Sequence, residues 1–283
     1  METEGDFTLT HFPRNQQPTT RARRWPAIQN GRAALVVAHP GHELRVYGWL
    51  EFVCPSVFVL TDGSGRTGHS RLDATSMLLA RVGAEPKSLY GRFTDAAIYA
   101  AILDHNVVLF TSLAEELATT LVREHVEYVV GDALEGYNPV HDICRYVINV
   151  AVVLAQRACG RRLANFDFPV IGQPDACPEE LRDQAAWLRL DDTALARKLT
   201  AARNYAELAA EVQAALDTIG AEAFRIECLR PVAERVELAE VPPFYERYGE
   251  QRVAARYYQR VLRYHEHMLP LAEALRAYAE GRS

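Results

Sequence analysis

Hydrophobic and polar positions along the chain follow two alternating patterns. Short apolar runs, typical of buried strands, occupy residues 33–38, 57–61 and 128–131. Longer segments with a helical spacing of apolar residues occupy 75–82, 114–125 and 145–157. Because strands that alternate with helices form βαβ units, the pattern predicts a Rossmann-like, three-layer α/β sandwich built on a mostly parallel sheet.

Beyond residue 169 the pattern is weaker, and it predicts three further elements. A helix is expected near residues 192–216, an edge strand at 223–231, and a helical stretch at 249–279. Proline cannot donate the hydrogen bond that a helix interior needs, so Pro270 should kink or divide the last stretch.

These elements predict one enlarged domain rather than two. Residues 1–30 are polar and are expected to form an N-terminal tail that frays or drapes over the surface. Residues 31–235 are expected to form an α/β catalytic domain. Residues 236–283 are expected to form a C-terminal helical extension packed on that same domain.

Composition narrows the range of partners. The net charge of -6 is mixed in sign and offers no broad attraction for nucleic acid or anionic lipid. No run approaches the ~18 apolar residues of a membrane span, and the polar N-terminus lacks the apolar core of a signal peptide. The five cysteines include no CxxC pair, which argues against a disulfide framework. We expect a cytoplasmic protein with a small-molecule substrate, and the sequence leaves open whether it is a homo-oligomer.

Candidate chemistry lies where the predicted strands end. His39 and His42 follow the first strand, Asp62 follows the second, and His141 follows the third through the loop 132–140. Open α/β sheets bind ligands outside the carboxyl ends of their strands, so these loops should meet at one crevice. Neutral imidazole is the commonest protein ligand of zinc, and a catalytic zinc site needs three protein ligands. The chain can supply that set, although two histidines at a strand end could also be surface or hydrogen-bonded loop residues.

The segments His39-Pro-Gly-His-Glu43 and Asn138-Pro-Val-His141 resemble the two metal-binding motifs of the LmbE-like, or PIG-L, family of zinc-dependent de-N-acetylases. The likeness covers roughly residues 30–230 and includes the glycine-rich turn after the second strand. It implies a site for Zn²⁺ or another divalent metal, with His39, His42 and His141 as ligands. It also implies that Arg71 contacts the substrate.

The departures from the family pattern concern the catalytic groups. The family's general base is an aspartate, and Gly41 stands at that position here. Asn138 stands where the family has a histidine that stabilises the oxyanion, and its amide still donates a hydrogen bond. A site of three neutral histidines is more positive than the family's site. It should therefore acidify a bound water toward a pKa of ~7 without a strong adjacent base.

A carboxylate elsewhere could replace the missing base. Asp142 is the first candidate, and Glu43, Asp62 and Glu135 lie in segments predicted to meet at the same crevice. Asp142 could instead be a helix N-terminal acid, and Glu43 could hold a ligand histidine or a nearby arginine. Tyr137 and Asp62 are candidate substrate contacts beside Arg71.

One competing motif is the sequence 63–68, which matches GxGxxG after a strand and could bind a nucleotide phosphate. It follows the second strand rather than the first and lacks the acidic residue about twenty positions later. We therefore interpret it as a flexible turn that lines the pocket.

Two hypotheses follow from these residues. The first is a metal-dependent amide hydrolase that acts on an N-acylated amino sugar or a related small amide. The second is a divergent LmbE-like protein that binds a sugar or nucleotide-linked ligand, or performs another reaction, because Gly41 removes the usual base.

Overall fold

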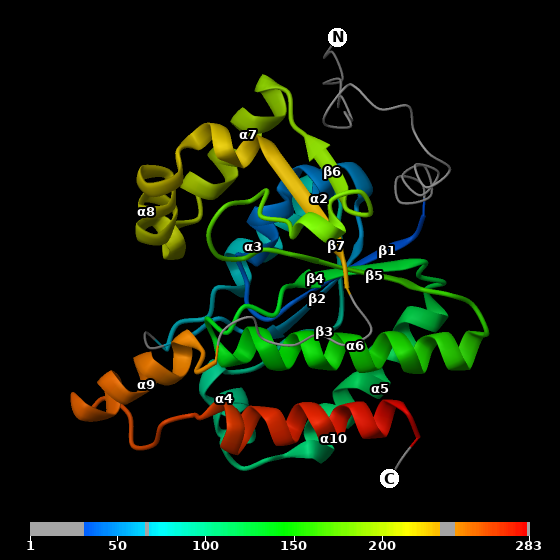
Figure 1. Ribbon diagram of the computed structural model, residues 1–283. Helices are drawn as coiled ribbons and strands as arrows, with labels where there is room; N and C mark the ends of the chain where they lie inside the picture. Colours follow the sequence, from blue (N-terminus) through cyan, green and yellow to red (C-terminus); the bar gives the residue numbers. More distant parts are fainter. Residues whose placement is uncertain (1–30, 66–67, 233–240, 282–283) are drawn as a thin grey trace.

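The computed structural model describes residues 31–65, 68–232 and 241–281 (Figure 1). The predicted tail 1–30 and the predicted boundary after residue 235 lie outside the described residues. The strands are β1 (Ala33–Val37), β2 (Ser56–Thr61), β3 (Glu85–Phe93), β4 (Tyr128–Asp132), β5 (Ala164–Phe168), β6 (Ala186–Arg189) and β7 (Ile226–Pro231). The helices are α2 (Tyr47–Val53), α3 (Leu72–Val82), α4 (Asp95–Leu103), α5 (Val107–Arg123), α6 (Pro139–Cys159), α7 (Asp192–Arg203), α8 (Ala209–Ile219), α9 (Phe244–Ala254) and α10 (Leu269–Ala279).

The strands form one sheet in the order β3-β2-β1-β4-β5-β7-β6. The first five strands run parallel, and β7 pairs antiparallel with β5 and β6. This confirms the predicted mostly parallel sheet. The strand order reverses at β1 and β4, so the loops after these two strands open at the same crevice.

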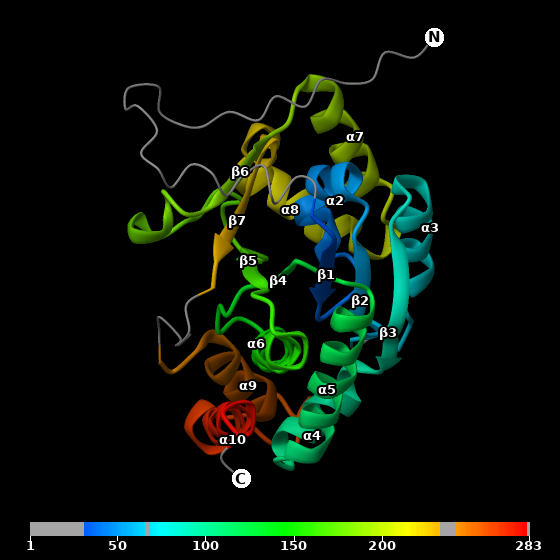
Figure 2. The ribbon, with the colours of Figure 1, turned by 90° about the vertical axis from the view of Figure 1, so that its right-hand side faces the viewer.

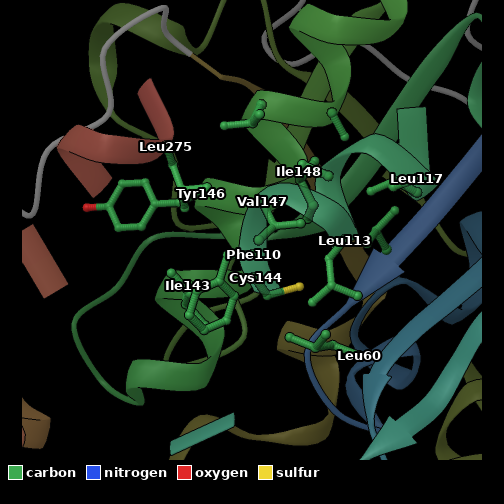
Figure 3. Packing of buried hydrophobic residues seen from close by; sticks show 14 of the residues in the cluster. Leu60, Phe110, Leu113, Leu117, Ile143, Cys144, Tyr146, Val147, Ile148 and Leu275 are labelled. Atoms are coloured by element: carbon green, nitrogen blue, oxygen red, sulfur yellow. The ribbon is translucent and has the colours of Figure 1, made fainter. Parts of the chain in front are cut away.

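Helices cover both faces of the sheet (Figure 2). One face packs against α4, α5, α6 and α10, and the other packs against α2, α3 and α7. Residues of β1 alternate between these two cores: Ala34 and Val36 face the first, while Leu35 and Val37 face the second. Figure 3 shows the first core, where Phe110 and residues of α6 pack together. Burial on both faces explains why β1 is a continuous apolar run.

The last helix belongs to the same core as the sheet. Leu275 of α10 is buried in the first core and α10 contacts both α5 and α6 (Figure 3). None of the helices in the described ranges is both long enough and apolar enough to cross a membrane.

Two predicted elements between residues 192 and 231 differ from the structure. The single predicted helix is two helices, because α7 ends at Arg203 and a buried Tyr205 separates it from α8. The predicted edge strand is the interior strand β7, because the four-residue strand β6 pairs along its outer side. A strand that short carries too little periodicity to be recognised from the sequence.

The predicted helix at 249–279 also differs from the structure. Helix α9 starts earlier, at Phe244, and ends at Ala254, and the chain is not α-helical again until α10 begins at Leu269. Pro270 lies in the first turn of α10. Backbone N–H groups in a first turn have no acceptor within the helix, so the N–H that proline lacks costs no hydrogen bond. The proline therefore starts a helix instead of dividing one.

Candidate metal centre

Three histidine rings from two loops lie together at the carboxyl edge of the sheet. His39 and His42 follow β1, and His141 lies in the first turn of α6. The ring centroids are 5.2 Å apart for His39 and His42, 5.0 Å for His39 and His141, and 4.5 Å for His42 and His141. The structure thus brings together the three predicted ligands, and we call them the imidazole cluster.

At Nδ1, His39 is hydrogen-bonded to a hydroxyl and lies beside a carboxylate. Its Nδ1 lies 2.7 Å from Thr61 Oγ1 and 2.8 Å from Asp95 Oδ1. Asp95 is itself fixed, because its Oδ2 accepts a hydrogen bond of 2.6 Å from the Gly65 N–H. With the proton on Nδ1, the lone pair of His39 is on Nε2, the nitrogen that faces away from these partners.

His42 is oriented by a second carboxylate. Its Nδ1 lies 2.9 Å from Asp132 Oδ2, and the same oxygen accepts a 2.7 Å hydrogen bond from the Ala38 N–H. Asp132 is fully buried at the end of β4. A carboxylate that accepts the second ring N–H is the usual companion of a metal-ligating histidine, because it fixes the ring and raises its basicity.

His141 has no such companion. The residue is 4% exposed, and its Nδ1 is buried without a hydrogen-bond partner among the described residues. Burial lowers the pKa of His141 well below its usual value, and the nearby charges of His42, His39 and Arg71 lower it further. Burial also lowers the pKa of His39. His39 and His141 therefore favour neutral imidazole, the form that binds metals.

The ring nitrogens do not yet converge on one point. Within the described ranges, no group of three or more His, Cys, Asp or Glu side chains is placed so that it could hold a metal ion. The terminal torsion of histidine is broad, so a small rotation changes the direction of a ring nitrogen at little cost. No hydrogen bond holds His141 at Nδ1, so this ring is the one free to turn. The structure supplies the donors in proximity, and metal binding is still a prediction.

Asn138 is placed beside the cluster by its role as a helix cap. Its Oδ1 accepts a 2.9 Å hydrogen bond from the Val140 N–H and so caps α6, and Pro139 occupies the first turn. Because the oxygen is used in the cap, the amide nitrogen turns outward and lies 3.4 Å from His39 Nε2. A donor next to the metal-facing nitrogen is what the predicted oxyanion role requires.

Arg71 and Asp62 lie on the other side of the same crevice. The Arg71 guanidinium packs so closely over Gly63 that an added Cβ would lie 2.5 Å from its Nε. That Nε is buried without a partner among the described residues. Asp62 uses Oδ1 to accept hydrogen bonds from the Ser64 N–H and hydroxyl, and so shapes the glycine-rich turn. The GxGxxG segment, which we interpreted as a turn rather than a phosphate loop, does not open a helix directly, because α3 starts only at Leu72.

The remaining candidate carboxylates hold backbone groups. Asp142 Oδ1 accepts from the N–H groups of Glu135 and Gly136, and burial raises the pKa of Asp142 to about 7. Glu135 accepts from the N–H groups of Val170 and Ile171. Asp142 therefore braces the loop that carries Asn138, and its role as a base is still a prediction.

Glu43 supports the loop that carries His39 and His42 through two hydrogen bonds. Its Oε2 accepts from the Gly41 N–H at 2.7 Å, and its Oε1 accepts from the Thr75 hydroxyl at 2.6 Å. Tyr205 lies 2.9 Å from the same Thr75 oxygen and donates to the Arg71 carbonyl. Glu43 thus supports the loop through the Gly41 N–H and the Thr75 hydroxyl, rather than through the ligand histidine or the arginine that the sequence suggested, and these contacts tie the histidine loop to the Arg71 segment.

The backbone conformation and the surroundings of Gly41 both disfavour a side chain at this position. Its φ of +103° lies in the region that favours glycine. A Cβ at this position would lie 2.2 Å from Leu208 Cδ1 and 3.7 Å from the Tyr205 ring. The apolar side chain of Leu208 therefore lies where a side chain at position 41 would begin, and it would have to move to admit one.

Sequence reasoning missed Asp95 and Asp132. Asp132 ends β4, and the rule that selected Asp62 at the end of β2 also applies to it. Asp95 follows β3, which has little apolar periodicity and was not predicted, so no strand end marked this residue.

Comparisons with known proteins give matches at the level of structure alone. No family model matches the sequence, and no curated protein matches it. Among solved structures, the chain is similar to the A40926 pseudoaglycone deacetylase Dbv21, with 18% identity over 74% of this chain and 100% of that one and a TM-score of 0.48. It is also similar to the zinc-inhibited form of the teicoplanin deacetylase Orf2, with 12% identity over 71% of this chain and 98% of that one and a TM-score of 0.49. At this identity the likeness concerns the fold and leaves the site residues undecided.

Proposed function

We propose that the protein is a metal-dependent amide hydrolase that removes the acyl group of an N-acylated amino sugar or a related small amide. The observation that carries the proposal is the imidazole cluster, in which carboxylates stand behind two of the three rings. A metal-ligating histidine usually has a companion, such as a carboxylate, at its second ring nitrogen. His39 and His42 each have one such carboxylate.

The residues fit a divalent cation in kind, and their rings lie close to one another. His39, His42 and His141 would hold it, and the unpartnered Nδ1 of His141 leaves that ring free to adjust. When bound, such a cation supplies Lewis acidity, which polarises an amide carbonyl and lowers the pKa of water. Three neutral imidazoles leave the charge of the cation undiminished.

The chain's own residues would bind and orient the amide. The Asn138 amide, held by the helix cap, would donate to the carbonyl oxygen as negative charge develops. The Arg71 guanidinium has a buried, unpartnered Nε and would bind a polar or anionic group of the substrate. Asp142 would accept a proton from the attacking water once its carboxylate releases the backbone N–H groups that it now holds.

One observation favours a second function. Leu208 fills the space beside Gly41, so the position of the family's base is apolar. A protein that binds an acylated sugar without cleaving it, or that performs another reaction at the same cluster, needs no base at this position.

The test combines metal analysis with hydrolysis. Protein dialysed against Zn²⁺ should retain one ion per chain by mass spectrometry and release acetate from N-acetylglucosamine derivatives. His141→Ala should retain no zinc and should lose activity by about 10³-fold or more, because a Lewis acid contributes several kcal/mol. His265→Ala is the matched control, because His265 is exposed in the C-terminal region.

The outcomes separate the two functions. If folded wild-type protein takes up no zinc, both functions are rejected in the form that places a metal at the imidazole cluster. Protein that retains zinc and binds the sugars without releasing acetate would leave the binding function in place.

A further inference from the structure

A column of stacked aromatic rings begins next to the imidazole cluster. The rings of Tyr137 and Phe244 are 5.0 Å apart with planes 5° from parallel, and those of Phe244 and Tyr248 are 5.8 Å apart at 17°. The Arg252 guanidinium lies 5.7 Å from the Tyr248 ring centroid and also lies over the rings of Tyr257, at 3.9 Å, and Tyr258, at 5.8 Å. We call Tyr137, Phe244 and Tyr248 the ring column.

The column joins two segments that are far apart in the sequence. Phe244, Tyr248 and Arg252 are four residues apart on α9, so they share one side of that helix. Helix α9 is fixed to the loop before α6, because the Tyr245 N–H donates to the Gly136 carbonyl at 3.3 Å. This bond places Phe244 opposite Tyr137.

The column is exposed although its rings are large and apolar. Tyr137 is 42% exposed and Phe244 is 43% exposed. Phe244 is stacked on both sides, by Tyr137 and by Tyr248. Among the described residues, the ring that stacks on Tyr137 is Phe244, on one side. The outer face of Tyr137 is therefore the end of the stack at which another ring can be added.

The loop that carries Tyr137 also reaches the imidazole cluster. Tyr137 directly precedes Asn138, and the Asn138 amide nitrogen lies 3.4 Å from His39 Nε2. Adjacent Cα atoms are about 3.8 Å apart, so the backbone that carries the Tyr137 ring directly borders the residue that contacts His39.

We propose that the ring column binds a planar aromatic group attached to the substrate, as the next ring of the stack. The proposal rests on the proposed function, because it places the acyl-amide end of that substrate at the imidazole cluster. The preferred substrates are then aryl-bearing N-acyl amino sugars rather than the free sugar. A well-stacked aromatic pair corresponds to a gain of about tenfold in binding.

The test compares the phenyl and methyl glycosides of N-acetylglucosamine. The wild-type protein should favour the phenyl glycoside in kcat/KM by about tenfold. Phe244→Ala and Tyr137→Ala should each bring this ratio close to one, while Tyr137→Phe should keep it because the ring rather than the hydroxyl stacks. Phe52→Ala is the matched control: Phe52 is also 42% exposed, but it lies on α2 across the sheet (Figure 1). Its phenyl preference should equal that of the wild type.

A binding measurement separates this proposal from the proposed function. The same two glycosides are titrated by calorimetry into His141→Ala protein with and without Phe244→Ala. Tighter binding of the phenyl glycoside that disappears with Phe244→Ala supports the column even if no hydrolysis is ever found. Equal handling of both glycosides by the wild type overturns the column and leaves hydrolysis untouched. A change of molar mass in light scattering with Phe244→Ala also overturns it, because the column would then be a contact between copies of this chain.

Discussion

The two loops that form the imidazole cluster differ in how well their polar groups are satisfied. In the first loop, His39, His42 and Glu43 each contact a partner fixed elsewhere in the fold. In the second loop, His141 Nδ1 and Asp142 Oδ2 are buried without partners among the described residues. A buried polar atom without a partner costs about 1–3 kcal/mol, so the second loop is the part that a ligand would stabilise. The first loop is preorganised, whereas the second holds buried polar atoms that a bound ligand would satisfy.

Truncation of one histidine in each loop should give the largest difference. In metal-free protein, His42→Ala should lower the free energy of unfolding by about 2 kcal/mol more than His141→Ala, because it removes the ring that faces the buried Asp132. Urea denaturation of both variants measures this difference. Equal losses would mean that the first loop is no better organised than the second.

Substitution of Asp132, the carboxylate that contacts His42, tests the difference between the two loops through metal affinity. Asp132→Asn keeps an oxygen for the Ala38 N–H and the His42 ring but removes the charge. Loss of such a companion typically lowers metal affinity by about 10–100-fold, so competition with a zinc chelator should show a drop of that size. Asp142→Asn, which alters a carboxylate of the other loop, serves as the comparison and should change zinc affinity much less. Unchanged affinity in Asp132→Asn would show that Asp132 merely fills space.

The pH dependence of stability should reveal the strain in the second loop. Burial raises the pKa of Glu135 from 4.5 to about 7. The folded state thus binds this proton more tightly than the unfolded state. The stability from this group is full below pH 4.5 and is lost as the pH rises through 7.

Glu135→Gln should remove this loss. The variant should be about 1–2 kcal/mol more stable than the wild type at pH 8, after allowance for one weakened backbone hydrogen bond, and nearly equal to it at pH 4.5. Thermal unfolding at both pH values tests the sign. A variant that is less stable at pH 8 would contradict the raised pKa.

Much of the first loop and of the central sheet could be predicted from local pattern. The strands β1, β2 and β4 are apolar runs because they are buried on both faces, and the rule for strand ends then selected His39, His42 and His141. The helix α6 was also predicted, although its cap at Asn138 was assigned to catalysis alone. The strands β5 and β6 and the division between α7 and α8 were not predicted, because short or mixed elements are set by tertiary contacts.

The sequence by itself determined the fold class, the order of the first elements and the meeting of three histidines, because each depends on a local period or on the end of a buried strand. Only the tertiary structure decided which partners stand behind those histidines. Asp95 and Asp132 reach His39 and His42 across 56 and 90 positions of the chain, and Leu208 occupies the space beside Gly41 from an even more distant turn. Such contacts depend on how the loops pack against one another, and no local spacing of residues encodes that packing.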